Sequence, residues 1–151
     1  MIDATDRKIL NLLQADGRIT NLRLAEAVNL SPTPCLRRVA RLEEAGIISG
    51  YRAVVDPQAL GLSVRALVML KIANNTRKAA EEFAAGVREI SAITECVMTA
   101  GKLDYVANVY AASLSGYEEI VKDQIGNLPH LAGMETLFIL SDVVKRRPIG
   151  L

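Results

Sequence analysis

The 151-residue sequence contains few of the side chains that carry enzyme chemistry. It has no tryptophan, one histidine, His130, and two cysteines, Cys35 and Cys96. Two cysteines so far apart are too few for a disulfide scaffold or a zinc site. No nucleophile elbow, phosphate-binding loop, dinucleotide fingerprint or zinc-protease motif accompanies the histidine. We therefore expect a protein that is not an enzyme and that holds no metal and no cofactor.

Long hydrophobic runs are also missing, although hydrophobic residues make up 50% of the chain. The central apolar run, residues 66–70, is closed by Arg65 and Lys71. It is far shorter than the ~20 residues that a membrane-spanning helix requires. The first six residues are acidic and polar, unlike a secretory signal. We therefore expect a cytoplasmic protein without a membrane contact, made of one domain or two small ones.

A strong excess of either charge is missing as well, since the formal net charge is +1. Residues 1–62 hold eight basic and seven acidic side chains, and the rest of the chain holds ten of each. With no strongly basic half, any binding to DNA must use local clusters of basic residues and several copies of the domain. This balance favours a dimer or a larger assembly.

What the sequence does contain is a short arginine-rich helix pattern between residues 31 and 46. Ser31 is placed to cap the helix with its hydroxyl group, Pro32 suits the first turn, and Gly46 suits a left-handed end. The apolar side is predicted from residues at helical spacing, namely Leu36, Val39 and Leu42. Three arginines lie off that side, namely Arg37, Arg38 and Arg41. Such a helix suits an anionic partner, although a charge run by itself is more typical of a solvated face.

A second short helix pattern precedes this one. Residues 20–28 predict a helix capped by Thr20, and Asn29 suits a left-handed turn between the two helices. Two helices joined by about three residues are typical of a helix-turn-helix, whose second helix enters the major groove of DNA. An earlier helix, from Asp3 to Gly17, is expected to complete a three-helix core.

Residues 16–21 and 30–39 closely resemble the DNA-binding domain of the Lrp/AsnC family, whose members are transcription regulators that respond to amino acids. The Ser-Pro-Thr-Pro-Cys run at 31–35 is a specific match, and the resemblance returns at 99–105, so that it covers nearly the whole chain. It implies a DNA-binding surface made of Asn21, Ser31, Thr33, Pro34, Cys35, Arg37, Arg38 and Arg41. Thr33, Pro34 and Cys35 are expected to face base edges. We predict that Arg37 or Arg38 reads bases and that Arg41 positions the helix.

After these helices, residues 47–55 predict a short strand, and residues 57–62 a linker. A lone strand is not stable by itself. The resemblance implies that this strand pairs with the same strand of a second subunit, and that the domain is a winged helix-turn-helix. We place the border between two domains at 62/63.

The second half of the chain alternates between strand and helix patterns. Strands are expected at 64–72, 93–100, 105–111 and 133–145, and helices at 76–90 and from a capping box that begins at Ser115. The order βαββαβ is that of a ferredoxin-like domain. Leu67 and Met69 on the outer face of the first strand are expected to pack against a second sheet. The basic tail after residue 144 is expected to be loosely held.

The predicted fold class is therefore α+β. A winged helix-turn-helix DNA-binding domain with its strand and linker occupies residues 1–62. A ferredoxin-like effector-binding and oligomerisation domain occupies residues 63–151.

The turn between Thr99 and Tyr105 is a second candidate site. Gly101 lets the backbone approach a ligand. Asp104 can receive an ammonium group while free amides receive a carboxylate, and these are the two ends of an α-amino acid. A plain hairpin turn explains the same glycine and aspartate. The resemblance favours the ligand, because the family's effector lies near this turn, between dimers.

The predicted effector site comprises Thr99, Gly101, Asp104, Tyr105, Thr136 and Leu137. The last two match a second part of the family's site. Lys102 and Leu103 depart from many members of the family, which leaves the identity of the effector open. Apolar neighbours such as Val97 make leucine and methionine the first candidates.

These patterns favour a transcription regulator that binds double-stranded DNA at near-palindromic sites as a homodimer, and the resemblance implies that dimers assemble into octamers. An amino acid bound between dimers would change this assembly and, with it, DNA binding. Two other interpretations stay open. One is an architectural DNA-binding protein whose second domain serves assembly without a small-molecule effector. The other is a small ferredoxin-like enzyme with a regulatory head, which the missing acid–base or metal constellation disfavours.

Overall fold

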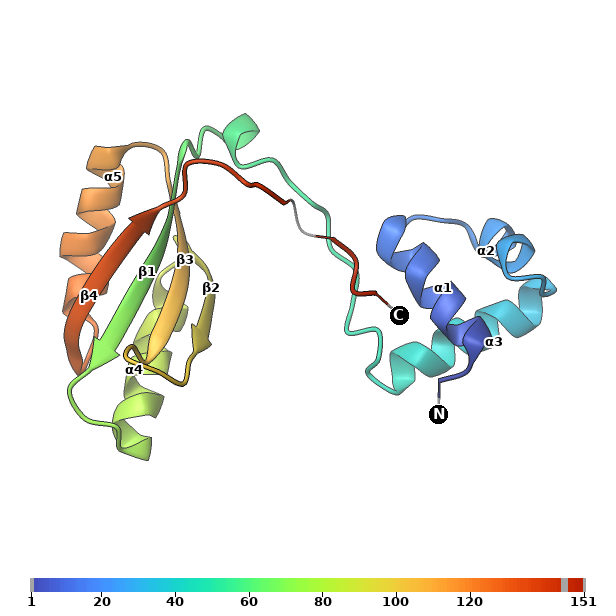
Figure 1. Ribbon diagram of the computed structural model, residues 1–151, viewed down its shortest axis with the longest axis horizontal. Helices are drawn as coiled ribbons and strands as arrows, with labels where there is room; N and C mark the ends of the chain where they lie inside the picture. The colour runs from blue at the N-terminus through green and yellow to red at the C-terminus, as the bar shows by residue number, and fades with distance from the viewer. Residues whose placement is uncertain (1, 145–146, 151) are drawn as a thin grey trace. The chain divides into compact units, whose positions relative to one another are not determined.

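The computed structural model describes residues 2–144 and 147–150 of the chain. They form two compact units (Figure 1). The first unit is made of residues 2–54 with 144 and 147–150, and the second is Val55–Val143. The division at 54/55 precedes the border predicted at 62/63, and the last described residues belong to the first unit. The rest of the basic tail, Lys145, Arg146 and Leu151, lies outside the described residues.

The first unit contains three helices: α1 Ala4–Ala15, α2 Asn21–Ala27 and α3 Pro32–Glu44. Asp3 and Asp6 form a reciprocal capping box at the start of α1. The hydroxyl of Thr20 accepts a hydrogen bond from the Arg23 amide at the start of α2. The buried side chains between the helices are Ile9, Leu10, Leu24, Ala25, Val28, Cys35 and Leu42. The predicted three-helix core is confirmed.

Left-handed residues stand where the sequence predicts them. Asn29, between α2 and α3, has a φ of 55°, and Gly46, after α3, has a φ of 67°. Ser31 precedes α3, but its side chain makes no capping hydrogen bond. The prediction that its hydroxyl caps the helix is therefore wrong. Pro34, at the third helical position, has no N–H to donate, so one of the two amides that a capping hydroxyl can bind is missing.

The buried side of α3 also differs from the prediction. Cys35 and Leu42 are buried and Val39 is half-buried, whereas Leu36 is 57% exposed. Positions 35, 39 and 42 recur at helical spacing just as 36, 39 and 42 do. A free cysteine behaves as a small apolar side chain, and here it takes the inward position that the sequence analysis gave to the leucine.

Residues 47–55 do not form the predicted strand within a single chain. Val54 is 99% exposed, and Val55 and Tyr51 are also exposed. One contact holds the middle of the segment, where the Tyr51 hydroxyl donates to Oε1 of Glu43 on α3 at 2.9 Å. A strand needs a partner for its backbone groups, and no described residue pairs with this segment as a strand.

The described end of the chain contacts α1. The side-chain amide of Gln14 donates to the carbonyl of Ile149 at 3.1 Å and accepts from the Ile149 amide at 2.8 Å. The tail, expected to be loosely held, is therefore joined to the first unit at Ile149, while the side chains of residues 147–150 stay exposed.

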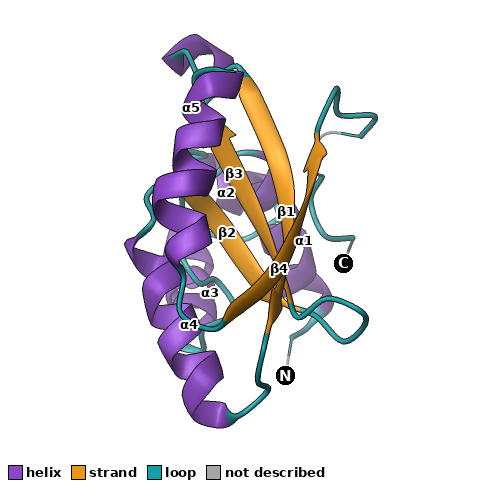
Figure 2. Cartoon of the chain, turned by 90° about the vertical axis from the view of Figure 1, so that its left-hand side faces the viewer, coloured by secondary structure: helices purple, strands orange, loops and turns teal. Residues whose placement is uncertain are grey.

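The second unit is a four-stranded antiparallel sheet with two helices on one face (Figure 2). The strands are β1 Val64–Ile72, β2 Ile93–Met98, β3 Tyr105–Ala111 and β4 Leu131–Phe138, in the order β2-β3-β1-β4. The helices are α4 Arg77–Glu89 and α5 Leu114–Glu119, and the latter continues as single turns through Ile120–Gln124 and Ile125–Asn127. A short 3₁₀ turn, Gln58–Leu60, precedes β1. The predicted ferredoxin-like order is confirmed.

Two predicted boundaries are corrected. The Oγ of Ser113 accepts from the Gly116 amide at 3.0 Å, so Ser113 and not Ser115 caps α5. The last strand begins at Leu131 and ends at Phe138 rather than running from 133 to 145. Its neighbour β1 begins at Val64, and the last contact between them is the Ile139 amide donating to the Arg65 carbonyl at 2.9 Å, so the chain after residue 140 has no residues of β1 opposite it. Residue 145 itself lies outside the described residues.

The two faces of the sheet differ in what packs against them. The helix side buries the core of the unit, which includes Ala66, Val68, Leu70, Phe83, Ala107 and Val109. On the other face, Leu67 lies beside Leu137 and Met69 lies beside Val106. Leu137 is 47% exposed. Because both helices lie on the helix side (Figure 2), no helix of this unit covers the opposite, partly apolar face, which we name the open face.

Candidate DNA-binding surface and ligand site

Two arginines of α3 are held by acids at the start of α1. Asp6 is completely buried; its Oδ1 accepts from Nη1 of Arg38 at 2.8 Å and its Oδ2 from Nη2 of Arg41 at 2.5 Å. Oδ2 of Asp3 accepts from the same Nη1 of Arg38 at 2.6 Å. We name these four side chains the α1–α3 clamp, because they fix α3 against α1.

The clamp keeps the Asp6 carboxylate ionised. Burial favours its neutral form, but the hydrogen bonds from the Asp3 amide and from Arg38 outweigh burial, so the pKa of Asp6 lies below its ordinary value of 3.8. Hydrogen bonds to Asp3 and Asp6 raise the pKa of the Arg38 guanidinium. Both partners are therefore charged at neutral pH, and Arg38 is committed to an internal contact.

The solvent side of α3 offers Thr33, Leu36 and Arg37, all exposed. These positions lie within about 100° of arc around the helix axis, opposite the buried Cys35 and Leu42. Arg37 makes no ion pair within the described part of the chain. Its guanidinium therefore has no competing carboxylate among the described residues and is available to an external anion.

The other residues predicted to contact DNA divide into internal and exposed ones. Cys35 is buried, and burial raises the pKa of its thiol, so its side chain cannot face a base. Nδ2 of Asn21 donates to the Pro32 carbonyl at 2.9 Å, which joins the starts of α2 and α3. Arg41 keeps 54% of its side chain exposed and can reach a phosphate. The exposed ones at the start of α3 are Ser31, Thr33 and Pro34.

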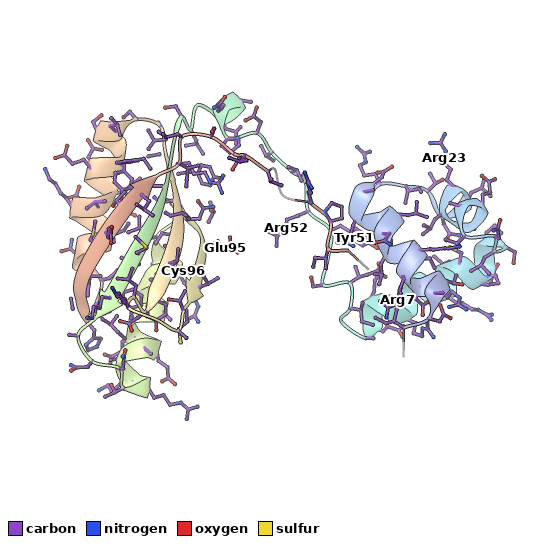
Figure 3. The ribbon with its side chains drawn as sticks, in the orientation of Figure 1. Arg7, Arg23, Tyr51, Arg52, Glu95 and Cys96 are labelled. Carbon is purple, nitrogen blue, oxygen red and sulfur yellow. The ribbon has the colours of Figure 1, made fainter. Side chains whose placement is uncertain are left out.

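The sequence analysis missed Arg23 on α2. Its side chain points away from the three helices (Figure 3) and has no ion pair among the residues the structure describes. The first helix of a helix-turn-helix crosses the DNA backbone, so a basic residue there is placed to contact a phosphate. The available signal was its position one turn after the Thr20 cap.

The turn after β2 is held mainly by Asp104. The Asp104 amide donates to the Leu70 carbonyl at 3.0 Å, and its carbonyl accepts from the Thr99 amide at 2.8 Å. Its Oδ2 accepts from the Ile72 amide at 2.9 Å. The Thr99 hydroxyl donates to the Leu103 carbonyl at 2.7 Å. Asp104 thus has a structural role, while its Oδ1 makes no hydrogen bond within the described chain.

A hollow of about 310 Å³ lies beside this turn. Thr99, Asp104 and Tyr105 line it from the sheet, and Thr76 and Arg77 line it from the start of α4. The first turn of a helix has free N–H groups and favours negative charge. A single chain therefore brings three of the predicted effector residues together, opposite a helix start.

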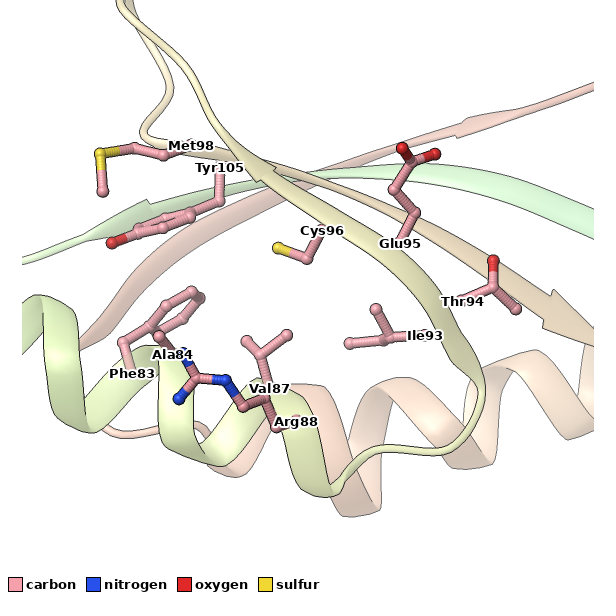
Figure 4. A pocket seen from close by; sticks show the side chains of 10 residues that line it. All are labelled: Phe83, Ala84, Val87, Arg88, Ile93, Thr94, Glu95, Cys96, Met98 and Tyr105. Carbon is pink, nitrogen blue, oxygen red and sulfur yellow. The ribbon is translucent and has the colours of Figure 1, made fainter. Parts of the chain in front are cut away.

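A second cavity of about 260 Å³ lies between β2 and α4 (Figure 4). Phe83 of α4 and Cys96 of β2 point into it, whereas Glu95 points to the other side of the strand (Figure 4). Met98 and Tyr105 line both this cavity and the hollow at the turn, so the two spaces adjoin. Burial raises the pKa of the Cys96 thiol, so this thiol is uncharged at neutral pH, while Arg88 and Glu95 also border the cavity.

The remaining predicted effector residues lie elsewhere. Gly101 is exposed in the turn and does not line the hollow. The Thr136 hydroxyl lies 2.5 Å from the Tyr117 hydroxyl of α5, and Leu137 lies on the open face. Because β2 and β4 are opposite edges of the sheet, a single chain does not bring Thr136 and Leu137 to the turn.

No cluster of acidic, cysteine or histidine side chains among the described residues is arranged around a possible ion site. His130 pairs with Glu82, with 2.6 Å between Nε2 and Oε2. None of the described helices combines the length and apolar character needed to cross a bilayer.

A helix-turn-helix with an unpaired arginine on the outer side of its second helix defines a DNA-binding unit, and the hollows of the sheet unit suit a small molecule. Together they define the class of ligand-responsive transcription regulators. Residues 2–49 match the family model of winged helix-turn-helix DNA-binding domains, and residues 65–149 match that of the Lrp/AsnC ligand binding domain. The chain belongs to the Lrp/AsnC family of DNA-binding transcriptional regulators, as the resemblance of its motifs implies.

Similar proteins span nearly the whole chain. A proline dehydrogenase transcriptional activator of Rhodobacter capsulatus is 40% identical over 146 residues, which cover 97% of this chain and 95% of that protein. The leucine-responsive regulatory protein of Salmonella typhimurium is 37% identical over 142 residues, covering 94% and 87%. The crystal structure of a transcriptional regulator from Neisseria meningitidis in complex with L-Met matches with a TM-score of 0.93 and 33% identity, covering 99% and 96%.

Proposed function

We propose that an α-amino acid binds at the turn between Thr99 and Tyr105, and that it changes how dimers of this chain associate and so how they bind DNA in the cytoplasm. The observation that carries the proposal is the hollow beside Asp104. Two features border this hollow. One is the Asp104 Oδ1, a carboxylate oxygen that has no hydrogen bond within the described chain, and the other is the first turn of α4. The first suits an ammonium group and the second a carboxylate. In the adjoining cavity, Phe83, Val87 and Ile93 offer apolar surface that suits an apolar side chain of the effector.

Leucine and methionine are the first candidate effectors. The similar regulator of Neisseria meningitidis was solved with L-Met, and the Salmonella relative is named leucine-responsive. Proline is a third candidate, because the Rhodobacter relative is named an activator of proline dehydrogenase. Thr136 and Leu137 belong to the proposed site through a neighbouring dimer, since the turn of their own chain is out of reach.

Calorimetric titration of the full-length protein with each of the amino acids tests this function. Saturable binding of one or a few of them is expected, together with a change in sedimentation on binding. A protein that binds none of them acts as an architectural DNA-binding protein, which is the second candidate function. Chemical conversion of the added amino acid would instead indicate an enzyme.

The full-length protein is expected to form homodimers that assemble into octamers, with no folded monomer at micromolar concentration. Residues 47–55 offer a segment whose backbone is not paired within the described chain, and the open face offers an apolar surface around Leu67. Leu67→Arg is expected to reduce the sedimentation coefficient, because burying an unpaired charge between sheets is costly. Leu60→Arg, at an exposed position of the 3₁₀ turn, is the matched control. A folded wild-type monomer at micromolar concentration contradicts this expectation.

Arg37→Ala is expected to weaken binding to a near-palindromic site and to relax its sequence preference, by ~1–3 kcal/mol of discrimination. Because Arg37 is exposed and unpaired within the described chain, thermal stability should stay unchanged. Arg41→Ala should weaken binding to all sequences alike and lower the salt dependence by about one ion. Lys122→Ala in the second unit is the control. Fluorescence anisotropy at several salt concentrations measures these effects, and unchanged curves for both arginine variants would show that α3 does not contact DNA.

A further inference from the structure

Leu36 is an apolar side chain that the fold leaves outside on its most arginine-rich helix. It is 57% exposed and does not belong to the buried core of the first unit. The inward positions of α3 are taken by Cys35 and Leu42, both buried, with Val39 packed against the same core. The three-helix core is thus complete without Leu36, and its side chain has no packing role within the unit.

The neighbours of Leu36 on the helix surface point to what it contacts. Leu36, Thr33 and Arg37 share one side of α3, with Thr33 between the other two around the axis. The clamp holds Arg38 and Arg41 toward Asp6, on the part of α3 that faces away from the leucine. The exposed side of α3 therefore presents one apolar and one cationic group, with Thr33 between them.

The major groove of DNA offers a matching pair of groups. The C5-methyl of thymine is the apolar group on the major-groove edges of the four bases, and O6 and N7 of guanine form the acceptor pair for arginine. We propose that Leu36 contacts a thymine methyl group in each half-site, beside the base that Arg37 reads. Leu36 then determines sequence preference at that position. The inference rests on α3 being the helix that enters the groove.

The test uses DNA in which thymine is replaced by deoxyuridine, which keeps the base pairing and lacks the methyl group. The probes are duplexes enriched from a random-sequence pool by the full-length protein, with each thymine of a half-site replaced in turn. The wild type should lose about fourfold in affinity at one thymine of each half-site, the effect of one buried methyl group. Replacing that thymine in both half-sites should lose about fifteenfold.

Leu36→Ala should bind the thymine and deoxyuridine duplexes equally well, with an unchanged thermal transition, because the side chain is exposed. Leu60→Ala changes an exposed leucine outside α3, and it should keep the wild-type ratio of affinities for the thymine and deoxyuridine duplexes. If Leu36→Ala keeps this ratio of affinities at every thymine, the inference is overturned. It is also overturned if the variant changes the sedimentation of the free protein and leaves the ratio unchanged, since Leu36 then serves contacts between copies. The Arg37→Ala variant distinguishes an error about Leu36 from an error about α3. If α3 does not contact DNA at all, Arg37→Ala binds DNA with the affinity of the wild type.

Discussion

Arg38→Ala is expected to destabilise the first unit more than Asp6→Asn does, although both variants break the same contact. In Arg38→Ala, the buried Asp6 carboxylate loses the charged partner of its Oδ1 and keeps Arg41 and the Asp3 amide at its Oδ2. A buried carboxylate oxygen left without its partner is costly. In Asp6→Asn, the arginines left behind turn to solvent, because the side chains of Arg38 and Arg41 are already 30% and 54% exposed. The loss for Asp6→Asn is expected to be roughly 1.5–3 kcal/mol, typical of a hydrogen bond to a charged group.

Urea unfolding combined with hydrogen exchange separates the two units. Amides of α1 and α3 should lose protection in both variants, whereas amides of β1 and β3 should keep it. Arg37→Ala, one position along the helix and unpaired within the described chain, is the control and should leave protection unchanged. An Arg38→Ala protein that unfolds at the wild-type urea concentration would show that the clamp does not stabilise the unit.

Acid should remove the difference between the wild type and Asp6→Asn. The pKa of Asp6 is lower in the folded state than its ordinary value of 3.8. A depressed pKa contributes stability that is complete above the unfolded value and is lost as the pH falls through the folded value. The gap in unfolding free energy should therefore stay constant at neutral pH and close below about pH 4. A gap that keeps its full size in stronger acid would contradict the role of the charge.

Asp104→Asn is expected to weaken amino-acid binding at least tenfold, which corresponds to ~1.4 kcal/mol, while the second unit stays folded. The asparagine carbonyl can accept from the Ile72 amide as the carboxylate does, so the turn is kept and the charge facing the ammonium group is lost. Asp104→Ala removes that acceptor as well and leaves a backbone amide without its partner. It should therefore lose both ligand affinity and thermal stability.

Calorimetry with leucine, methionine and proline, paired with thermal unfolding, distinguishes the two roles of Asp104. Asp123→Asn, at an exposed position after α5, is the control for loss of a carboxylate in the same unit. DNA binding without an amino acid should survive in all three variants, because Arg37 belongs to the other unit. If Asp104→Asn binds the effector as the wild type does, Asp104 keeps only its structural role.

Local patterns were enough to predict most elements and the position of α3. Asn29 and Gly46 mark the left-handed turns because few other residues adopt them at low cost, and both stand where expected. The inward side of α3 was assigned wrongly because Cys35 was not counted as apolar. The strand at 47–55 could not be verified in one chain, since it depends on a partner for its backbone.

The clamp and the contacts of Asp104 were beyond the reach of sequence patterns. Asp6 and Arg38 are 32 positions apart, and only the packing of α1 on α3 reveals that they meet. From the sequence alone, the three arginines between positions 37 and 41 are equally good candidates for contacting DNA. The packing of α1 on α3 shows which of them face inward. Asp104 was recognised as a turn residue, but its bond to Ile72 joins another strand, so it follows from the register of the sheet rather than from the turn.

The two cysteines lie in different units and differ in depth. Cys35 is completely buried in the three-helix core, and Cys96 is half-buried on β2. An alkylating reagent reacts with the thiolate of an accessible cysteine, and Cys35 becomes accessible only when α3 separates from the other helices. The alkylation rates of the two cysteines therefore report the accessibility of each unit separately, in the protein without any substitution. DNA bound at α3 is expected to slow alkylation of Cys35, and an amino acid bound beside β2 is expected to slow alkylation of Cys96. Coupling between the two ligands would then appear as a change in the alkylation rate of one cysteine when the ligand of the other unit binds.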